Sequence, residues 1–217
     1  MNLSYKQLLE IESQLNCPSG EGGLQIGATM NDSNAQMISS SIELLNVQED
    51  SCVLEVGHGI GGHVKNIIRK ANTVQYIGLE ISKTMNSEAI RINKSNQKQA
   101  SFIMYDGVNI PFGVNTFDRI LTVNTIYFWS NPRLFLKEIY RVLKPGSKLV
   151  IAFADKKFML GLPFVNNRFK LYSKEILTDL YVDSQFISIE FTEKHDSVLS
   201  KSGELVNRIY LVAELFK

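Results

Sequence analysis

A glycine-rich turn between a predicted strand and a predicted helix carries the clearest chemical signal in the sequence. The run VLEVGHGIGGHV at residues 53–64 begins with apolar strand residues and then places glycines at Gly57, Gly59, Gly61 and Gly62. Glycines let the backbone turn sharply and leave its N–H groups open to a ligand at a helix N-terminus. Glu55, a carboxylate two positions before the first glycine, is unusual in such a strand. We expect this segment to bind a nucleotide-like cofactor.

Three further polar residues stand at the ends of predicted strands. Glu80 ends the strand VQYIGLE, Asp106 follows the strand ASFIMY, and Asn124 follows the strand FDRILTV. Parallel strands present their carboxyl ends at one edge of a sheet, where ligands bind. An acid about twenty residues beyond the loop can accept both hydroxyls of a ribose, which is the role expected of Glu80. Asp106 could accept an adenine amino group, or it could simply form a turn in the run YDG.

The glycine loop alone fits two cofactors. Gly57, Gly59 and Gly62 match the spacing G-x-G-x-x-G of a dinucleotide-binding loop, and Glu80 would serve the ribose of NAD equally well. Glu55 favours a cofactor that carries an ammonium group and a sulfonium cation, because a carboxylate facing a diphosphate would be repelled. The sequence also shows no second domain to bring a hydride acceptor. Both points favour S-adenosylmethionine over NAD.

The pattern Glu55-x-Gly57-x-Gly59-x-Gly61 resembles the first motif of the class I S-adenosylmethionine-dependent methyltransferases. Glu80 matches that family's ribose-binding acid, and Asp106 matches its adenine-side acid. The segment FDRILTVNTIYFWSNPRLFLKEIYRVLKPGSKLVIAF at residues 117–153 is similar to the family's next strand, helix and "RVLKPGG" turn, with Ser147 in place of a glycine. The resemblance covers roughly residues 14–155 and is closest to the branch of small-molecule and quinone-type methyltransferases.

The resemblance implies an α/β fold and an activity. The fold would be a Rossmann-like, seven-stranded mixed sheet in the order 3-2-1-4-5-7-6, with the last strand antiparallel and helices on both faces. The activity would be methyl transfer from S-adenosylmethionine, with S-adenosylhomocysteine as the product. The cofactor-binding residues would be Glu55, Gly57, Gly59, Gly61, Glu80 and Asp106, and its position at a strand end adds Asn124. A non-catalytic binding protein with the same fold is the alternative, and an NAD-dependent oxidoreductase is a weaker one.

Aromatic residues mark the expected acceptor side of the site. Tyr127, Phe128 and Trp129 follow Asn124 at the reactive edge of the sheet, where aromatic faces could border a sulfonium or an apolar acceptor. Methyl transfer from a sulfonium mainly needs alignment and exclusion of water, so no nucleophile or general base is assigned. Tyr127 and Trp129 are the acceptor-side candidates. A long irregular and apolar segment at 155–172, together with residues 3–34, would roof a small, partly apolar acceptor.

The elements that must position these residues follow from hydrophobic periodicity. A helix over 3–15, which includes Leu3, a loop over 16–34 and a helix over 35–45 would form an N-terminal helical cap within residues 1–46. A single core domain over 47–217 would follow. Its strands are predicted at 52–56, 74–80, 100–105, 117–123, 148–154, 185–192 and 206–216, and its helices at 62–71, 83–97, 133–143 and 174–180. Only a short polar stretch at 193–205 joins the last two strands, which favours an antiparallel pair.

Composition restricts the class of protein. The chain has 217 residues, 44% of them hydrophobic, and a net charge of +1, which gives no basic footprint for nucleic acid. Cys17 and Cys52 lack metal-ligand spacing, and His58, His63 and His195 are scattered, so no metal site is expected. The N-terminus does not resemble a signal peptide, and no stretch approaches the ~20 apolar residues of a membrane span. We expect a cytoplasmic protein without stable membrane insertion.

Overall fold

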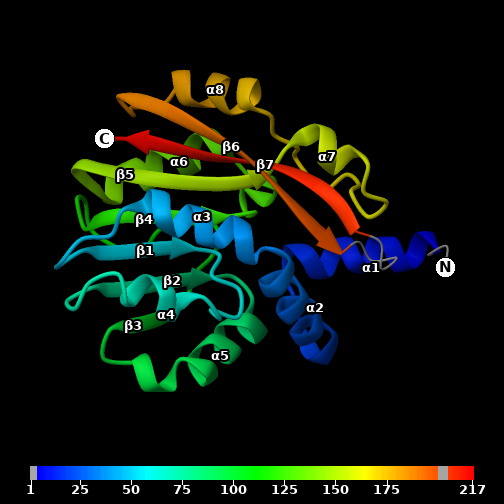
Figure 1. The fold of residues 1–217 in the computed structure, drawn as a ribbon, viewed down its shortest axis with the longest axis horizontal. Helices are drawn as coiled ribbons and strands as arrows, with labels where there is room; N and C mark the ends of the chain where they lie inside the picture. The colour runs from blue at the N-terminus through cyan, green and yellow to red at the C-terminus, as the bar shows by residue number, and fades with distance from the viewer. Residues whose placement is uncertain (1–3, 200–204) are drawn as a thin grey trace.

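The computed structural model describes residues 4–199 and 205–217, and its centre is a seven-stranded mixed sheet (Figure 1). The strands lie in the order β3-β2-β1-β4-β5-β7-β6, as predicted. All neighbours pair in parallel except β5 with β7 and β7 with β6, which are antiparallel. The strands are β1 (Cys52–Val56), β2 (Gln75–Glu80), β3 (Ala100–Met104), β4 (Phe117–Val123), β5 (Leu143–Ala154), β6 (Ser188–Leu199) and β7 (Leu205–Phe216).

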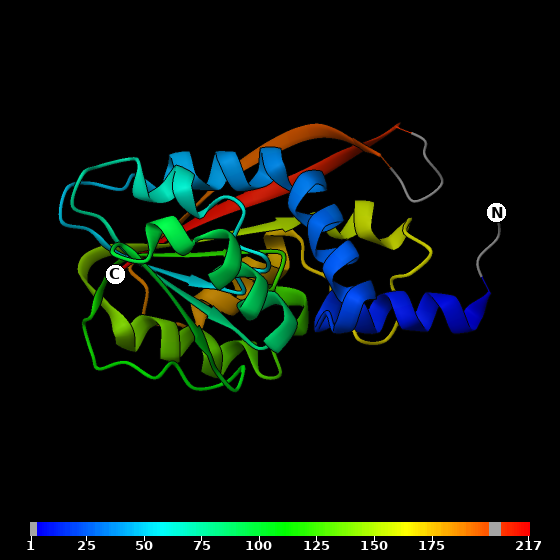
Figure 2. The same ribbon diagram turned by 90° about the horizontal axis from the view of Figure 1, so that it is seen from below.

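Helices cover both faces of this sheet. Figure 2 shows α3 (Ala35–Leu45) and α6 (Pro132–Val142) on opposite sides of the strands, and α3 packs against β4, β5 and β7. The remaining core helices are α4 (Val64–Ile68), α5 (Lys83–Ile92) with the 3₁₀ turn η1 (Lys94–Asn96), α7 (Lys156–Leu160) and α8 (Lys174–Val182). Ser82 and Ser173 accept N-cap hydrogen bonds from Met85 N and Ile176 N, as expected of these residues at helix starts.

The N-terminal cap differs from the prediction in one element. Residues 16–34 were expected to form a loop, because the run CPSGEGG is typical of turns, but Gly20–Ser33 form helix α2. Tertiary packing compensates for the poor helix propensity of glycine. A Cβ at Gly27 would lie 2.7 Å from Met85 Sδ on α5, so the small residue permits close helix contact. Helix α1 covers Tyr5–Asn16 with a Ser4 capping box, and Leu3 of the predicted helix lies outside the described residues.

Two other segments contain more regular structure than predicted. The polar stretch 193–205 was expected to be a connection, yet β6 continues to Leu199 and β7 begins at Leu205. Ladder pairing reaches the Asp196–Arg208 pair and beyond, so polar side chains are accommodated in paired strands. The predicted irregular segment 155–172 begins with α7, whose N-cap Asp155 accepts a hydrogen bond from Lys157 N.

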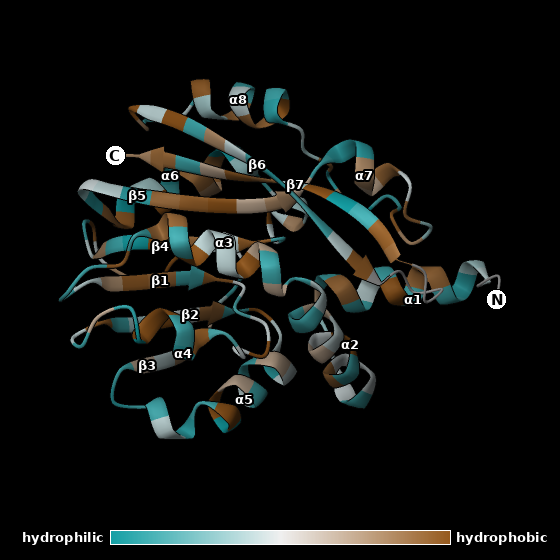
Figure 3. Cartoon of the chain, viewed as in Figure 1, coloured by the Kyte–Doolittle hydropathy of each residue, from teal (hydrophilic) through white to brown (hydrophobic). Residues whose placement is uncertain are grey.

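The hydrophobic core lies between the sheet and its helices. Val53, Leu54, Ile120 and Val150 have no exposed surface. Figure 3 shows mainly hydrophobic colour along β5, whereas hydrophobic and hydrophilic colours alternate along the helices. Among the residues that the model describes, no helix combines the length and apolar character needed to cross a membrane. This core fixes the carboxyl ends of β1, β2 and β4 side by side, which positions the candidate site.

Candidate functional site

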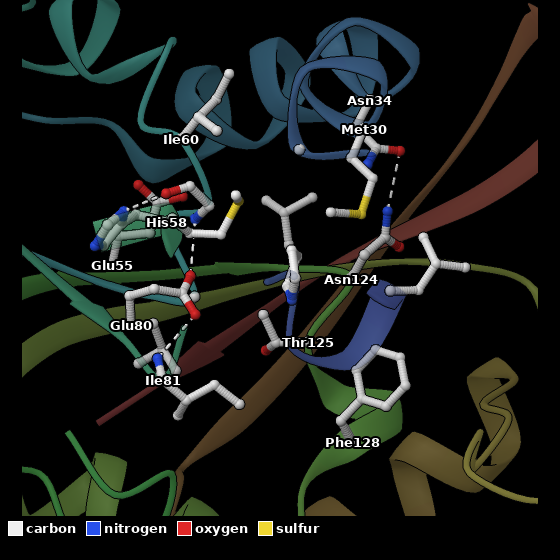
Figure 4. Close-up of a pocket in the computed structure, with 18 of the residues that line it drawn as sticks. Met30, Asn34, Glu55, His58, Ile60, Glu80, Ile81, Asn124, Thr125 and Phe128 are labelled. Atoms are coloured by element: carbon white, nitrogen blue, oxygen red, sulfur yellow. Dashed lines mark hydrogen bonds between the residues drawn. The ribbon is translucent and has the colours of Figure 1, made fainter. Parts of the chain in front are cut away.

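A cavity of about 180 Å³ opens at the carboxyl ends of β1, β2 and β4, beneath the N-terminal cap (Figure 4). Five of the residues predicted to bind a cofactor line it together: Glu55, Gly57, Gly59, Glu80 and Asn124. The cap contributes Leu15 from α1, Met30 from α2, Ile38 from α3, and Asn34 from the junction between α2 and α3. The structure does not place Gly61 or Asp106 on the cavity wall.

The glycine loop has the backbone shape that its sequence predicts. Gly57, Gly59 and Gly61 all have positive φ, at 76°, 57° and 64°, a region that glycine enters without steric cost. A Cβ on Gly57 would overlap the methyl group of Thr125 after β4. Gly61 packs against α5 instead of the cavity, where a Cβ would lie 3.2 Å from Ala89 Cβ. The loop is therefore clamped between the end of β4 and α5.

Glu80 joins the end of β2 to the glycine loop. Its side chain is buried. Oε2 accepts a hydrogen bond from Gly59 N at 3.0 Å, and Oε1 accepts from Ile81 N at 2.8 Å and Ser82 N at 2.9 Å. An ionised carboxylate offers about four acceptor positions, and the backbone fills three of them. Oε2 keeps the capacity to accept one hydroxyl from a ligand in the cavity.

Glu55 is held by two buried side chains. Its carboxylate accepts hydrogen bonds from His63 Nε2 at 2.8 Å and Tyr76 Oη at 2.6 Å. Burial alone would raise the pKa of Glu55, but the positive His63 and the two hydrogen bonds outweigh it and hold that pKa below its usual range. The pKa of His63 is correspondingly raised by the Glu55 carboxylate, against the opposing effect of burial. Glu55 therefore reaches the cavity as part of an ion pair and not as a bare carboxylate.

His58 belongs to the glycine loop itself, and its side chain is buried. Its Nδ1 donates to Gly59 O at 2.8 Å, and its ring packs edge-on against Phe102 with centroids 5.0 Å apart. Gly78 on β2 makes room for this ring, because a Cβ there would lie 2.5 Å from His58 Cδ2. Burial lowers the pKa of His58, so the ring is neutral at neutral pH. The His58 ring thus anchors the glycine loop to β2 and β3.

The Asp106 carboxylate stabilises the turn in which it lies. The residue is exposed, and its carboxylate accepts hydrogen bonds from Val108 N at 2.8 Å and from Asn109 N at 2.7 Å. The neighbouring residues Tyr105 and Gly107 line the cavity. Asp106 shapes the segment that borders the cavity without lining it.

The acceptor-side candidates have different positions. Tyr127, in the 3₁₀ turn η2 (Ile126–Phe128), is buried behind the cavity wall, where its Oη bonds Asn124 Oδ1 at 3.0 Å and accepts from Ala154 N at 2.7 Å. Burial raises the pKa of Tyr127, so it does not act as a base at neutral pH. Phe128 and Trp129 do line the cavity, and Trp129 Nε1 donates to Thr125 Oγ1 at 3.1 Å.

Sequence reasoning assigned no role at the site to two residues. His63 was expected only in a first helical turn, although its spacing eight residues after Glu55 spans the loop that both support. Arg208 was treated only as part of a strand, yet its side chain is buried and donates to Asn34 at the cavity. Asp196, the ion-pair partner of Arg208, lies in the stretch 193–205 that was expected to be a connection, so the facing of these two charges could not be predicted. Within residues 4–199 and 205–217, no group of three His, Cys, Asp or Glu side chains could hold a metal ion.

The sequence is similar to those of known methyltransferases. Residues 54–151 match a family model described as a methyltransferase domain. The O-methyltransferase resE of Aspergillus sclerotiorum is 31% identical over 183 residues, covering 74% of this chain and 68% of that protein. The uncharacterized methyltransferase YdaC of Bacillus subtilis is 26% identical over 131 residues, covering 60% and 71%.

Solved structures share the fold. A putative methyltransferase crystallised with the Trm112 methyltransferase activator of Haloferax volcanii superimposes with a TM-score of 0.72 at 16% identity. The alignment covers 88% of this chain and 92% of that one.

Proposed function

Because this chain belongs to the class I S-adenosylmethionine-dependent methyltransferases, we propose that it methylates a small, partly apolar acceptor beneath its N-terminal cap. The observation that carries the proposal is the division of the cavity wall. The glycine loop and Glu80 form one side, whereas Leu15, Met30 and Phe128 form an apolar side next to the end of β4. A cofactor and an apolar acceptor could meet between these two sides.

The residues present fit the cofactor. Glu80 Oε2 retains one acceptor position for a ribose hydroxyl, and the positive-φ glycines leave bare backbone beside it. Ile81, Met85 and Tyr105 supply apolar surface for an adenine ring. A cavity of about 180 Å³ is smaller than the roughly 300–1,000 Å³ typical of ligand pockets. We infer that the cap shifts outward when the cofactor enters.

The chain's own contribution to catalysis is alignment and exclusion of water. When bound, S-adenosylmethionine supplies a sulfonium methyl group that needs no further activation. The cap helices and Phe128 would hold the acceptor against the end of β4 and keep water out. Trp129 would form part of that wall, and Tyr127 would act from behind it by fixing Asn124.

The test has two stages. In calorimetry, S-adenosylhomocysteine should bind with micromolar affinity and NAD should not bind; a preference for NAD would contradict the proposal. A panel of apolar hydroxyl, amine, thiol and carbon acceptors, with tRNA and DNA as further arms, should then show turnover with small molecules. Turnover with nucleic acid only would refute the small-molecule acceptor. Cofactor binding without turnover across the whole panel would favour a non-catalytic binding protein.

A further inference from the structure

A buried ion pair lies behind the cap end of the cavity. Asp196 on β6 and Arg208 on β7 face each other in the strand register, and both residues are more than nine-tenths buried. Arg208 Nε donates to Asp196 Oδ1 at 3.0 Å, and Nη2 donates to Oδ2 at 2.6 Å. Such a bidentate pair fixes the orientation of the guanidinium plane. Its remaining N–H groups therefore point in fixed directions.

Those N–H groups reach the junction between α2 and α3. Arg208 Nη1 donates to Asn34 Oδ1 at 2.8 Å, and Nη2 donates to Ser33 O at 2.9 Å. Asn34 is the single residue that separates the two helices. Because a guanidinium only donates, the atom of the Asn34 amide that faces Arg208 must be the oxygen. Arg208 thus decides which way this amide is turned.

A second asparagine shares the same oxygen. Asn124 Nδ2 donates to Asn34 Oδ1 at 3.1 Å (Figure 4), while Asn124 Oδ1 accepts from Tyr127 Oη. Both asparagines line the cavity. With its oxygen fully engaged, Asn34 keeps its Nδ2 group for a ligand. In the described part of the chain that nitrogen has no hydrogen-bond partner.

The two ends of the cavity offer complementary chemistry. At the glycine-loop end Glu80 accepts hydrogen bonds, and at the cap end the Asn34 and Asn124 amides offer N–H donors. A ligand with its ribose at Glu80 would place its amino-acid portion toward the cap. A carboxylate is the group that such amide donors bind.

We propose that Arg208 is a positioning residue for methyl transfer, which with Asp196 holds the Asn34 amide so that its N–H groups bind the carboxylate of S-adenosylmethionine. The inference rests on the proposed cofactor site. Arg208 itself does not touch the cofactor; it acts through Asn34. The prediction is a selective effect on ligands that carry this carboxylate.

The test compares two ligands by calorimetry. S-adenosylhomocysteine carries the carboxylate, and methylthioadenosine lacks the whole amino-acid portion. Asn34→Ala and Arg208→Lys should each weaken S-adenosylhomocysteine binding about tenfold or more and change methylthioadenosine binding less than about twofold. Glu80→Ala should weaken both ligands. Arg91→Lys, on the exposed face of α5 and paired with Glu88, is the matched control and should change neither.

A double-mutant cycle separates positioning from general stabilisation. Arg208→Lys added to Asn34→Ala should cause no further loss of affinity, because the contact through which Arg208 acts is already gone. If Arg208→Lys does not fold, Asp196→Leu combined with Arg208→Met removes both charges together and is judged in the same way. Equal loss of both ligands, additive losses, or unchanged binding would each overturn the inference. Failure of the wild-type protein to bind S-adenosylhomocysteine would instead overturn the proposed function.

Discussion

Replacing Glu80 by alanine tests the cofactor site most directly. The carboxylate accepts three backbone N–H groups, from Gly59, Ile81 and Ser82, and has one acceptor position left. A hydrogen bond from a ribose hydroxyl to this charged group is worth about 1.5–3 kcal/mol. At about 1.4 kcal/mol per tenfold, Glu80→Ala should weaken S-adenosylhomocysteine binding by roughly tenfold to 150-fold.

The same substitution should also lower thermal stability, because Gly59 N loses its partner and the loop loses its tie to β2. Affinity must therefore be measured by calorimetry below the unfolding transition, with circular dichroism to confirm the fold. Glu80→Gln keeps one acceptor oxygen and should fall between wild type and Glu80→Ala. Glu88→Ala, on the exposed side of α5, should leave binding unchanged. A folded Glu80→Ala protein with wild-type affinity would show that the ribose is held elsewhere.

Substitutions test the roles of the residues that support the cavity. The raised pKa of His63 means that its pairing with Glu55 stabilises the fold below about pH 6.5 and is lost as pH rises through the folded-state value. Urea unfolding should show the free energy of unfolding falling as the pH rises above about 6.5, and His63→Gln should abolish this pH dependence. Gly78→Ala should destabilise the protein by about 1–3 kcal/mol, because the added Cβ would overlap the His58 ring. In urea unfolding, His58→Ala should restore stability to the Gly78→Ala variant. If it does not, the overlap with His58 is not the cause. Asp106→Ala should weaken S-adenosylhomocysteine binding in calorimetry by less than about tenfold, because its carboxylate serves its own turn.

The sheet and the loop were predictable because their signals are local. Gly57, Gly59 and Gly61, directly after an apolar strand, predict a sharp turn, and they allow the positive φ angles that the loop adopts. The strand order came from the family resemblance and was confirmed. Helix α2 was not predictable in this way, because its sequence favours turns. It exists through contacts with α5 that are remote in the chain.

At the candidate site, the directions of the side chains could not be predicted from the sequence. Strand position indicates which residues reach the reactive edge, but it does not fix the direction of each side chain. Glu80 turns toward the loop and the cavity, whereas Asp106 turns into its own loop and Tyr127 packs behind the wall. Partners distant in sequence fix these directions. Ala154 N donates a hydrogen bond to Tyr127 Oη, and Arg208 Nη1 donates one to Asn34 Oδ1. No local pattern encodes such pairs.

The buried polar groups around the cavity have one consequence in common. Glu80 holds the glycine loop from β2, the Glu55–His63 pair supports it from β1, and Arg208 holds the cap junction at Asn34. Each support sets the position of backbone or amide N–H groups before any ligand arrives, which lowers the ordering cost of binding. The fixed part of the cavity is therefore the part that we propose faces the cofactor. In the proposed function, the apolar cap side chains select the acceptor and would shift outward when the cofactor enters.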